Sequence, residues 1–152
     1  MKKYLITLLL ALTIGFFLAN FFIKQYDDYN GIKVSNTGDT LYFVQYGAFS
    51  SLESMEENTI SLQNYVYSED ENLYYVYVGI TSIKENAEKI VEFYKNNGYE
   101  AIIKEFEISN TNFLESLKTY DDVLKNTEDE TAIASVINQV LMKYEEVVIN
   151  GG

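Results

Sequence analysis

Residues 41–50, LYFVQYGAFS, return in a related form at residues 73–82, LYYVYVGITS. The two segments have Leu, Tyr, Val, Gly and Ser at matching positions, and both are rich in aromatic and β-branched residues. Residues of these types favour β-strands, whereas the Gly and Ser near the end of each copy favour a turn and a helix N-cap. The sequence therefore predicts one structural unit that occurs twice.

Each copy is followed by a helical pattern and then by a short strand. After Ser82 the apolar residues recur at helical spacing: Ile83, Ala87, Ile90, Val91 and Tyr94. Asn97-Gly98 supplies a left-handed stop, and a weaker helical pattern follows Ser51. Short strands at 65–67 and 100–108 close the two halves. Two β-α-β halves in tandem predict an α+β fold of the split β-α-β type. Its four-stranded antiparallel sheet carries both helices on one face and leaves the other face open.

From Ser109 onward the pattern is helical only. Apolar residues recur at helical spacing over 113–124 and 133–148, on either side of a polar turn at 126–129. A short connection predicts an antiparallel helical hairpin, which we place at 109–152. Its apolar stripe must be covered, either by the repeat domain at 41–108 or by another protein of the cell envelope.

The N-terminal run 4–23, YLITLLLALTIGFFLANFFI, has 20 residues and no formal charge. As a helix it is about 30 Å long, enough to span a bilayer. Lys2 and Lys3 precede the run, which puts the N-terminus in the cytoplasm and the rest of the chain outside. A cleaved signal peptide is the alternative, but cleavage after Ala19 would place Phe17 where a small residue is required.

We therefore expect a cytoplasmic tip and transmembrane anchor at 1–23 and a polar tether at 24–40. The protein is then a single-pass membrane protein with an extracytoplasmic C-terminal domain. Beyond Lys24 the chain has eight lysines and 23 acidic residues, a net charge of −15. Such a surface repels phosphate polymers, so we expect no nucleic-acid partner. A neutral or cationic partner is compatible with it, as is a charged surface that only maintains solubility.

The chain has no Cys and no His, so it has neither thiolate nor imidazole for a metal site or a nucleophile. Three acidic clusters are the remaining candidates for acid-base or cation chemistry: 69–71, 121–122 and 128–130. We place them in solvated loops and turns, and none has the ligand spacing of a calcium loop. The sequence predicts no enzyme, no metal and no cofactor.

Residues 42–51, YFVQYGAFSS, together with 75–79, YVYVG, resemble the SPOR domain, a peptidoglycan-binding module of bacterial cell-division and sporulation proteins. The resemblance covers residues 41–108. It implies a membrane-anchored protein whose exported domain binds glycan strands stripped of their stem peptides. The chain departs from the family at 79–82, where many relatives carry Gly-Pro-Phe, in its scarcity of basic residues and in its C-terminal hairpin.

Strand alternation places Phe43 and Gln45 on the same sheet face as Tyr75 and Tyr77 of the neighbouring strand. Aromatic rings pack against the C–H bonds of sugars, and an amide supplies two donors and an acceptor to hydroxyl or N-acetyl groups. In the family the glutamine and this sheet face belong to the glycan site, and Gln45 matches that position. These four residues are the predicted glycan site. The alternative is that the aromatic residues are core beneath the C-terminal hairpin.

Overall fold

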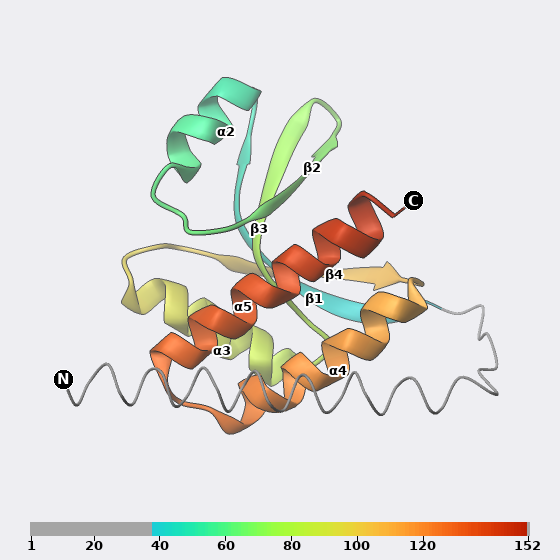
Figure 1. The fold of residues 1–152 in the computed structure, drawn as a ribbon. Helices are drawn as coiled ribbons and strands as arrows, with labels where there is room; N and C mark the ends of the chain where they lie inside the picture. The colour runs from blue at the N-terminus through green and yellow to red at the C-terminus, as the bar shows by residue number, and fades with distance from the viewer. Residues whose placement is uncertain (1–37, 152) are drawn as a thin grey trace. The chain divides into compact units, whose positions relative to one another are not determined.

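The structure is a computed structural model that describes residues 38–151. The predicted anchor at 4–23 and nearly all of the tether at 24–40 lie outside these residues, so both stay predictions. Within the described part of the chain, no helix is both long and apolar enough to cross a membrane. The described residues, which are the coloured part of Figure 1, belong to one compact unit.

Four strands form the sheet: β1 (Asp39–Phe49), β2 (Val66–Asp70), β3 (Leu73–Thr81) and β4 (Ile102–Ile108). Their order is β2-β3-β1-β4, and every neighbouring pair is antiparallel. Helix α2 (Leu52–Thr59) connects β1 to β2, and α3 (Lys84–Asn96) connects β3 to β4. The two copies of the repeat are therefore the central strands, and the predicted α+β fold with a four-stranded antiparallel sheet is confirmed.

Local sequence explains where these elements begin and end. The hydroxyl of Ser51 accepts a hydrogen bond from the backbone N–H of Ser54 and caps α2. Gly98 ends α3 with a φ of 86°, the left-handed conformation that glycine adopts without steric cost. Glu71 and Asn72 turn β2 into β3 with φ values of 49° and 62°. Two consecutive positive φ values give the tight turn whose twist matches that of a hairpin.

Helices α2 and α3 cover one face of the sheet. A Cβ atom on Gly79 of β3 would lie 2.8 Å from Cγ2 of Ile90 in α3 and 3.6 Å from Cβ of Val44 in β1. On the same side, the hydroxyl of Tyr46 donates to the carbonyl of Asn58 in α2. Val44 and Gly79 therefore face α3, and Tyr46 reaches α2.

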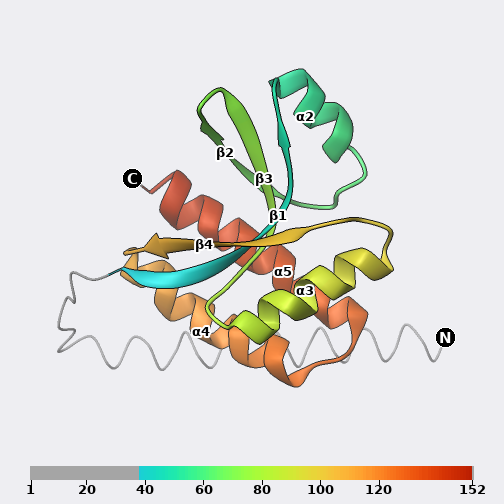
Figure 2. The same ribbon diagram turned by 180° about the vertical axis from the view of Figure 1, so that it is seen from behind.

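The C-terminal residues form the predicted hairpin of α4 (Thr111–Asn126) and α5 (Glu130–Tyr144), followed by the π-helical turn η1 (Glu145–Ile149). Asn110 and Asp129 cap the two helices with their side chains. Helix α5 crosses in front of the sheet in Figure 1 and lies behind β4 in Figure 2, whereas α3 lies on the opposite side. The apolar stripes of both helices are buried within this unit.

The expectation of an open second sheet face is therefore wrong where α5 crosses it. The hairpin brings an apolar stripe that water disfavours, and the sheet offers an aromatic face that can bury it. Of the two coverings left open by the sequence, the repeat domain is the one that the structure shows.

A buried polar network joins α4 to the turn before α3. The carboxylate of Asp121, only 2% exposed, accepts hydrogen bonds from the hydroxyl of Thr81, from the backbone N–H of Ser82 at 2.9 Å and from the Ser82 hydroxyl at 2.6 Å. The amide of Asn86 donates to the Asp121 carbonyl at 3.0 Å. The expectation that the 121–122 cluster is solvated is wrong for Asp121, because these donors replace water around its charge.

Candidate functional site

The neighbouring central strands bring three of the four predicted site residues together. The rings of Phe43 and Tyr77 are 5.3 Å apart in an edge-to-face arrangement, and Gln45 lies opposite Tyr77 across β1 and β3. Tyr75 comes two residues before Tyr77 on β3 and lies opposite Ala48 of β1. Alternation along β3 puts Tyr75 and Tyr77 on the same face, so the predicted cluster exists.

Helix α5 covers most of this cluster. Its Tyr144 ring lies 5.5 Å from the Phe43 ring. Phe43 is 3% exposed, Tyr77 7% and Gln45 9%. Burial raises the pKa of Tyr77 although a hydrogen bond with Ser68 opposes the rise, and burial also raises the pKa of Tyr144. Phe43 and Tyr77 are therefore part of the core, as the alternative reading of the sequence had it.

The amide of Gln45 differs from its aromatic neighbours. It forms no hydrogen bond with any residue in the range 38–151. Within the same range, however, no fully buried side-chain nitrogen or oxygen lacks a partner. The amide atoms must therefore touch solvent, while the stem of the side chain is packed away. The Gln45 amide thus keeps two donors and one acceptor that solvent can reach, on the sheet face that α5 partly covers.

Beyond α5 the sheet continues uncovered. Figure 1 shows the β2–β3 hairpin and the end of β1 projecting past α5 on the side of α2. On the face of Tyr75, its two cross-strand neighbours are Ala48 and Ser68, which are both exposed, and Tyr75 itself is half-buried. The rings of Tyr67 and Tyr74 lie 6.2 Å apart on the opposite face. An accessible strip with the Gln45 amide and the Tyr75 ring thus remains, and we call it the rim site.

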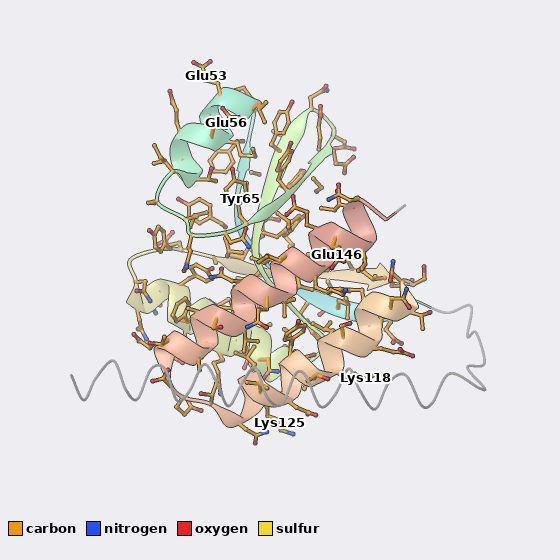
Figure 3. All side chains as sticks on the ribbon, viewed as in Figure 1. Glu53, Glu56, Tyr65, Lys118, Lys125 and Glu146 are labelled. Atoms are coloured by element: carbon orange, nitrogen blue, oxygen red, sulfur yellow. The ribbon has the colours of Figure 1, made fainter. Side chains whose placement is uncertain are left out.

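The rim site lies in an anionic part of the domain. Residues 48–83, which form α2, β2 and β3, contain no lysine or arginine. Six acidic residues in this range are exposed: Glu53, Glu56, Glu57, Glu69, Asp70 and Glu71. Figure 3 shows Glu53 and Glu56 at this end, whereas Lys118 and Lys125 lie on α4. The local charge favours a neutral or cationic ligand over an anionic one.

Sequence reasoning missed the covering residues and the groups that hold them. Tyr144 had no distinguishing signal, because an aromatic residue on an amphipathic helix is ordinary. Asp121 and its partners Thr81 and Ser82 are far apart in the chain, so no local pattern connects them. Within residues 38–151 no group of three or more acidic side chains is arranged to hold a metal ion.

Comparisons with known proteins complete the description of the site. No model of a known protein family matches the chain, and no curated protein matches it either. Among solved structures, the chain is similar to the solution structure of the peptidoglycan-binding domain of CwlC, a cell wall lytic enzyme of B. subtilis. The two are 31% identical, with a TM-score of 0.40. The match covers 51% of this chain and 100% of the CwlC domain.

Proposed function

We propose that this domain binds the glycan strands of peptidoglycan through the rim site. The observation that carries the proposal is the Gln45 amide, which has no partner among residues 38–151 and reaches solvent on the sheet face of Tyr75. Gln45 is also the residue that matches the glycan-site glutamine of the SPOR motif. The similar domain of CwlC is a peptidoglycan-binding domain.

The rim site has the chemistry of a small sugar platform. The half-buried Tyr75 ring offers a face to the C–H bonds of a pyranose, and the Gln45 amide can pair with a hydroxyl or an N-acetyl group. Phe43 and Tyr77 support this platform from below and contact no ligand themselves. A preference for glycan stripped of stem peptides is what the SPOR resemblance implies.

The same proposal includes an exported, membrane-anchored protein. The uncharged run at 4–23 and the lysines before it support an anchor with a cytoplasmic N-terminus. A tether at 24–40 then lets the domain reach the cell wall. The role that we propose is in bacterial cell division or sporulation, as the SPOR resemblance implies.

A second candidate function is docking of another envelope protein. The apolar stripes of the hairpin no longer support it, because they are buried within the domain. The outer strand β4 does favour it, because Ile102 is 54% exposed and Phe106 40% exposed on a sheet edge that pairs on one side only. The ring centroids of Phe106 and Phe43 are 5.0 Å apart, so a partner bound to β4 would contact a ring that packs on the aromatic core.

Co-sedimentation with peptidoglycan sacculi tests the first candidate. The full chain, in a detergent without a sugar headgroup, is mixed with intact sacculi and with sacculi stripped of stem peptides by an amidase. We expect stronger pelleting with the stripped material. Gln45→Ala and Tyr75→Ala should each weaken pelleting about tenfold, the effect of losing roughly 1.4 kcal/mol of contact.

Tyr67→Ala is the matched control. Tyr67 is an exposed tyrosine of the same hairpin, but it lies on the opposite sheet face. Its replacement should leave pelleting unchanged. Equal loss of pelleting in all three variants would show that these strand residues matter only for folding. A well-folded chain that pellets with neither kind of sacculus would leave the β4 edge as the better candidate.

A further inference from the structure

A cavity of about 210 Å³ lies where three separate segments meet. Its walls are the loop after α2, the C-terminal end of α3 with the turn that follows it, and α5. The lining includes Gln63 from the loop, Phe93 and Tyr99 from the α3 region, and Ala134 and Asn138 from α5. We call it the α3–α5 cavity. It exists only because the C-terminal hairpin supplies one wall.

Hydrogen bonds and ring contacts hold the other walls in place. The hydroxyl of Tyr99 donates to the carbonyl of Ser61 at 3.3 Å, which ties the loop after α2 to the turn after α3. The Tyr99 ring packs edge-to-face on Tyr94 at 6.2 Å. The hydroxyl of Tyr94 in turn donates to the carbonyl of Val78 in β3 at 3.1 Å. The cavity is therefore preformed, so a ligand does not have to order these walls.

Two amide side chains in the lining are available to a ligand. Neither Gln63 nor Asn138 forms a side-chain hydrogen bond with any residue of the described range. They belong to different walls, one to the loop and the other to α5. Each amide offers two donors and one acceptor. Together with Phe93 and Tyr99, they form a lining that is part aromatic and part amide.

The lining carries no charge. None of the residues around the cavity is acidic or basic, although residues 38–151 include 21 acidic residues and seven lysines. An ionic ligand would lose hydration without meeting a counter-charge, and an anion would also be repelled by the surrounding domain. The volume is below the roughly 300–1,000 Å³ of pockets for drug-sized ligands, so the ligand is small.

We propose that the α3–α5 cavity binds a single uncharged, N-acetylated sugar unit. The absence of charge and the small size follow from the cavity itself. The choice of an N-acetylated sugar rests on the proposed peptidoglycan binding. An acetamido group has one N–H donor and one carbonyl acceptor, which the amides of Gln63 and Asn138 can meet. Its methyl group and the sugar C–H bonds pack against Phe93 and Tyr99.

Titration with three disaccharides tests this inference. The full chain, in a detergent without a sugar headgroup, is titrated with diacetylchitobiose, with the cationic disaccharide of glucosamine and with cellobiose, which lacks acetamido groups. Calorimetry measures affinity, and ¹⁵N amide shifts locate the site. We expect diacetylchitobiose to shift residues 61–63, 93–99 and 134–138. The other two sugars should bind at least about tenfold more weakly, because they lack the acetamido hydrogen bonds.

Two variants on α5 change the cavity in different ways. Asn138→Ala removes one amide and should weaken binding about tenfold, since one hydrogen bond is lost and its acetamido partner is left unpaired in the cavity. Ala134→Leu fills the cavity with a good helix former and should abolish the shifts there. Gln139→Ala is the matched control, because Gln139 does not line the cavity and its amide already donates to Ser135 at 3.2 Å. Asn138→Ala keeps the test valid if Ala134→Leu does not fold.

The failure of this inference can be told apart from failure of the proposed function. Shifts confined to Gln45 and Tyr75 would overturn the cavity site and leave peptidoglycan binding in place. Equal affinity for the glucosamine disaccharide would overturn it as well, because a cation has no partner in the lining. Pelleting with sacculi but no response to any disaccharide would overturn the cavity site alone. No pelleting and no response would remove both.

Discussion

The two copies of the repeat have the same sequence pattern and both supply central strands with buried residues, but only the helix of the second copy packs deeply on the sheet. Helix α3 of the second copy has 13 residues, and its Ile90 packs on Gly79 of β3. Helix α2 of the first copy has eight residues and buries only Met55 and Thr59. Leu52, at its start, is 42% exposed, and Ile60, just after it, is 87% exposed.

The C-terminal hairpin accounts for this difference. It bonds to the second copy through Asp121, and Lys89 of α3 donates to backbone carbonyls at the C-terminal end of α4. It also covers the face of Phe43 and Tyr77. The end of the sheet beside α2 stays uncovered, and this is where the rim site lies. The repeat therefore specifies the sheet, whereas the hairpin decides which part is rigid core and which part remains accessible.

The largest expected loss of stability comes from removing the hydrogen bonds that join the helical hairpin to the second copy. Asp121→Ala removes the carboxylate partner of the buried Thr81 hydroxyl and Asn86 amide and of the more exposed Ser82 hydroxyl. We expect the free energy of unfolding to fall by about 3 kcal/mol, as for other broken buried networks. Urea unfolding of residues 37–152, followed by circular dichroism, measures it.

The adjacent residue provides the control for this prediction. Asp122 is exposed, and its replacement by Ala should change the unfolding free energy by less than about 0.5 kcal/mol. If the two variants were equally stable, the hairpin would not depend on the network, and the contrast between the two copies would need another cause.

The next effect tests the contact between α3 and the sheet. In Gly79→Ala the new Cβ would lie 2.8 Å from Cγ2 and 3.2 Å from Cδ1 of Ile90, closer than carbon atoms pack. Overpacking of this kind should cost about 2 kcal/mol. Adding Ile90→Ala should remove most of the extra cost, so the double-mutant cycle should show strong coupling. Additive effects would mean that α3 adjusts its position freely.

How far the sequence predicts the fold depends on whether a signal is local. The repeat, the strand alternation and the Asn97-Gly98 stop are local, and they led to the four-stranded antiparallel sheet with β1 beside β3 and to the grouping of Phe43 with Tyr77. The apolar stripe at 133–148 predicts that this helix packs against another surface, but it does not identify that surface. The sequence therefore allowed two interpretations of Phe43 and Tyr77, an accessible glycan site and a buried core.

Two other features had no local signal at all. Asp121 beside Asp122 has the pattern of a solvated helix surface, because the donors that bury it come from the turn before α3. The α3–α5 cavity joins side chains from three segments whose contact depends on the docked hairpin. Features made by long-range packing are the part that sequence reasoning could not reach.

A smaller effect is expected for the lysine that joins α3 to α4. The ammonium of Lys89 donates to the carbonyls of Leu124 at 3.0 Å and Thr127 at 2.9 Å, at the end where the helix dipole favours a positive charge. Lys89→Met keeps the apolar stem and should cost about 1 kcal/mol. The exposed Lys84→Met is the control. The ion pair of Lys89 with Glu128 is exposed at its Glu128 end, so 0.5 M salt should reduce the loss in Lys89→Met only slightly.

The smallest effect is expected at the glycine of the first copy that matches Gly79. A Cβ on Gly47 would lie 2.8 Å from Cζ of Phe49, but this is the far end of a partly exposed side chain that can rotate away. Gly47→Ala also reduces the entropy of the unfolded chain. We therefore expect a change within about 0.5 kcal/mol, measured by the same urea unfolding as Gly79→Ala. Equal losses at Gly47 and Gly79 would show that the first copy is packed as tightly as the second. The strands of the rim site would then be packed as tightly near α2 as they are near α3, and the rim site would lie on a rigid surface.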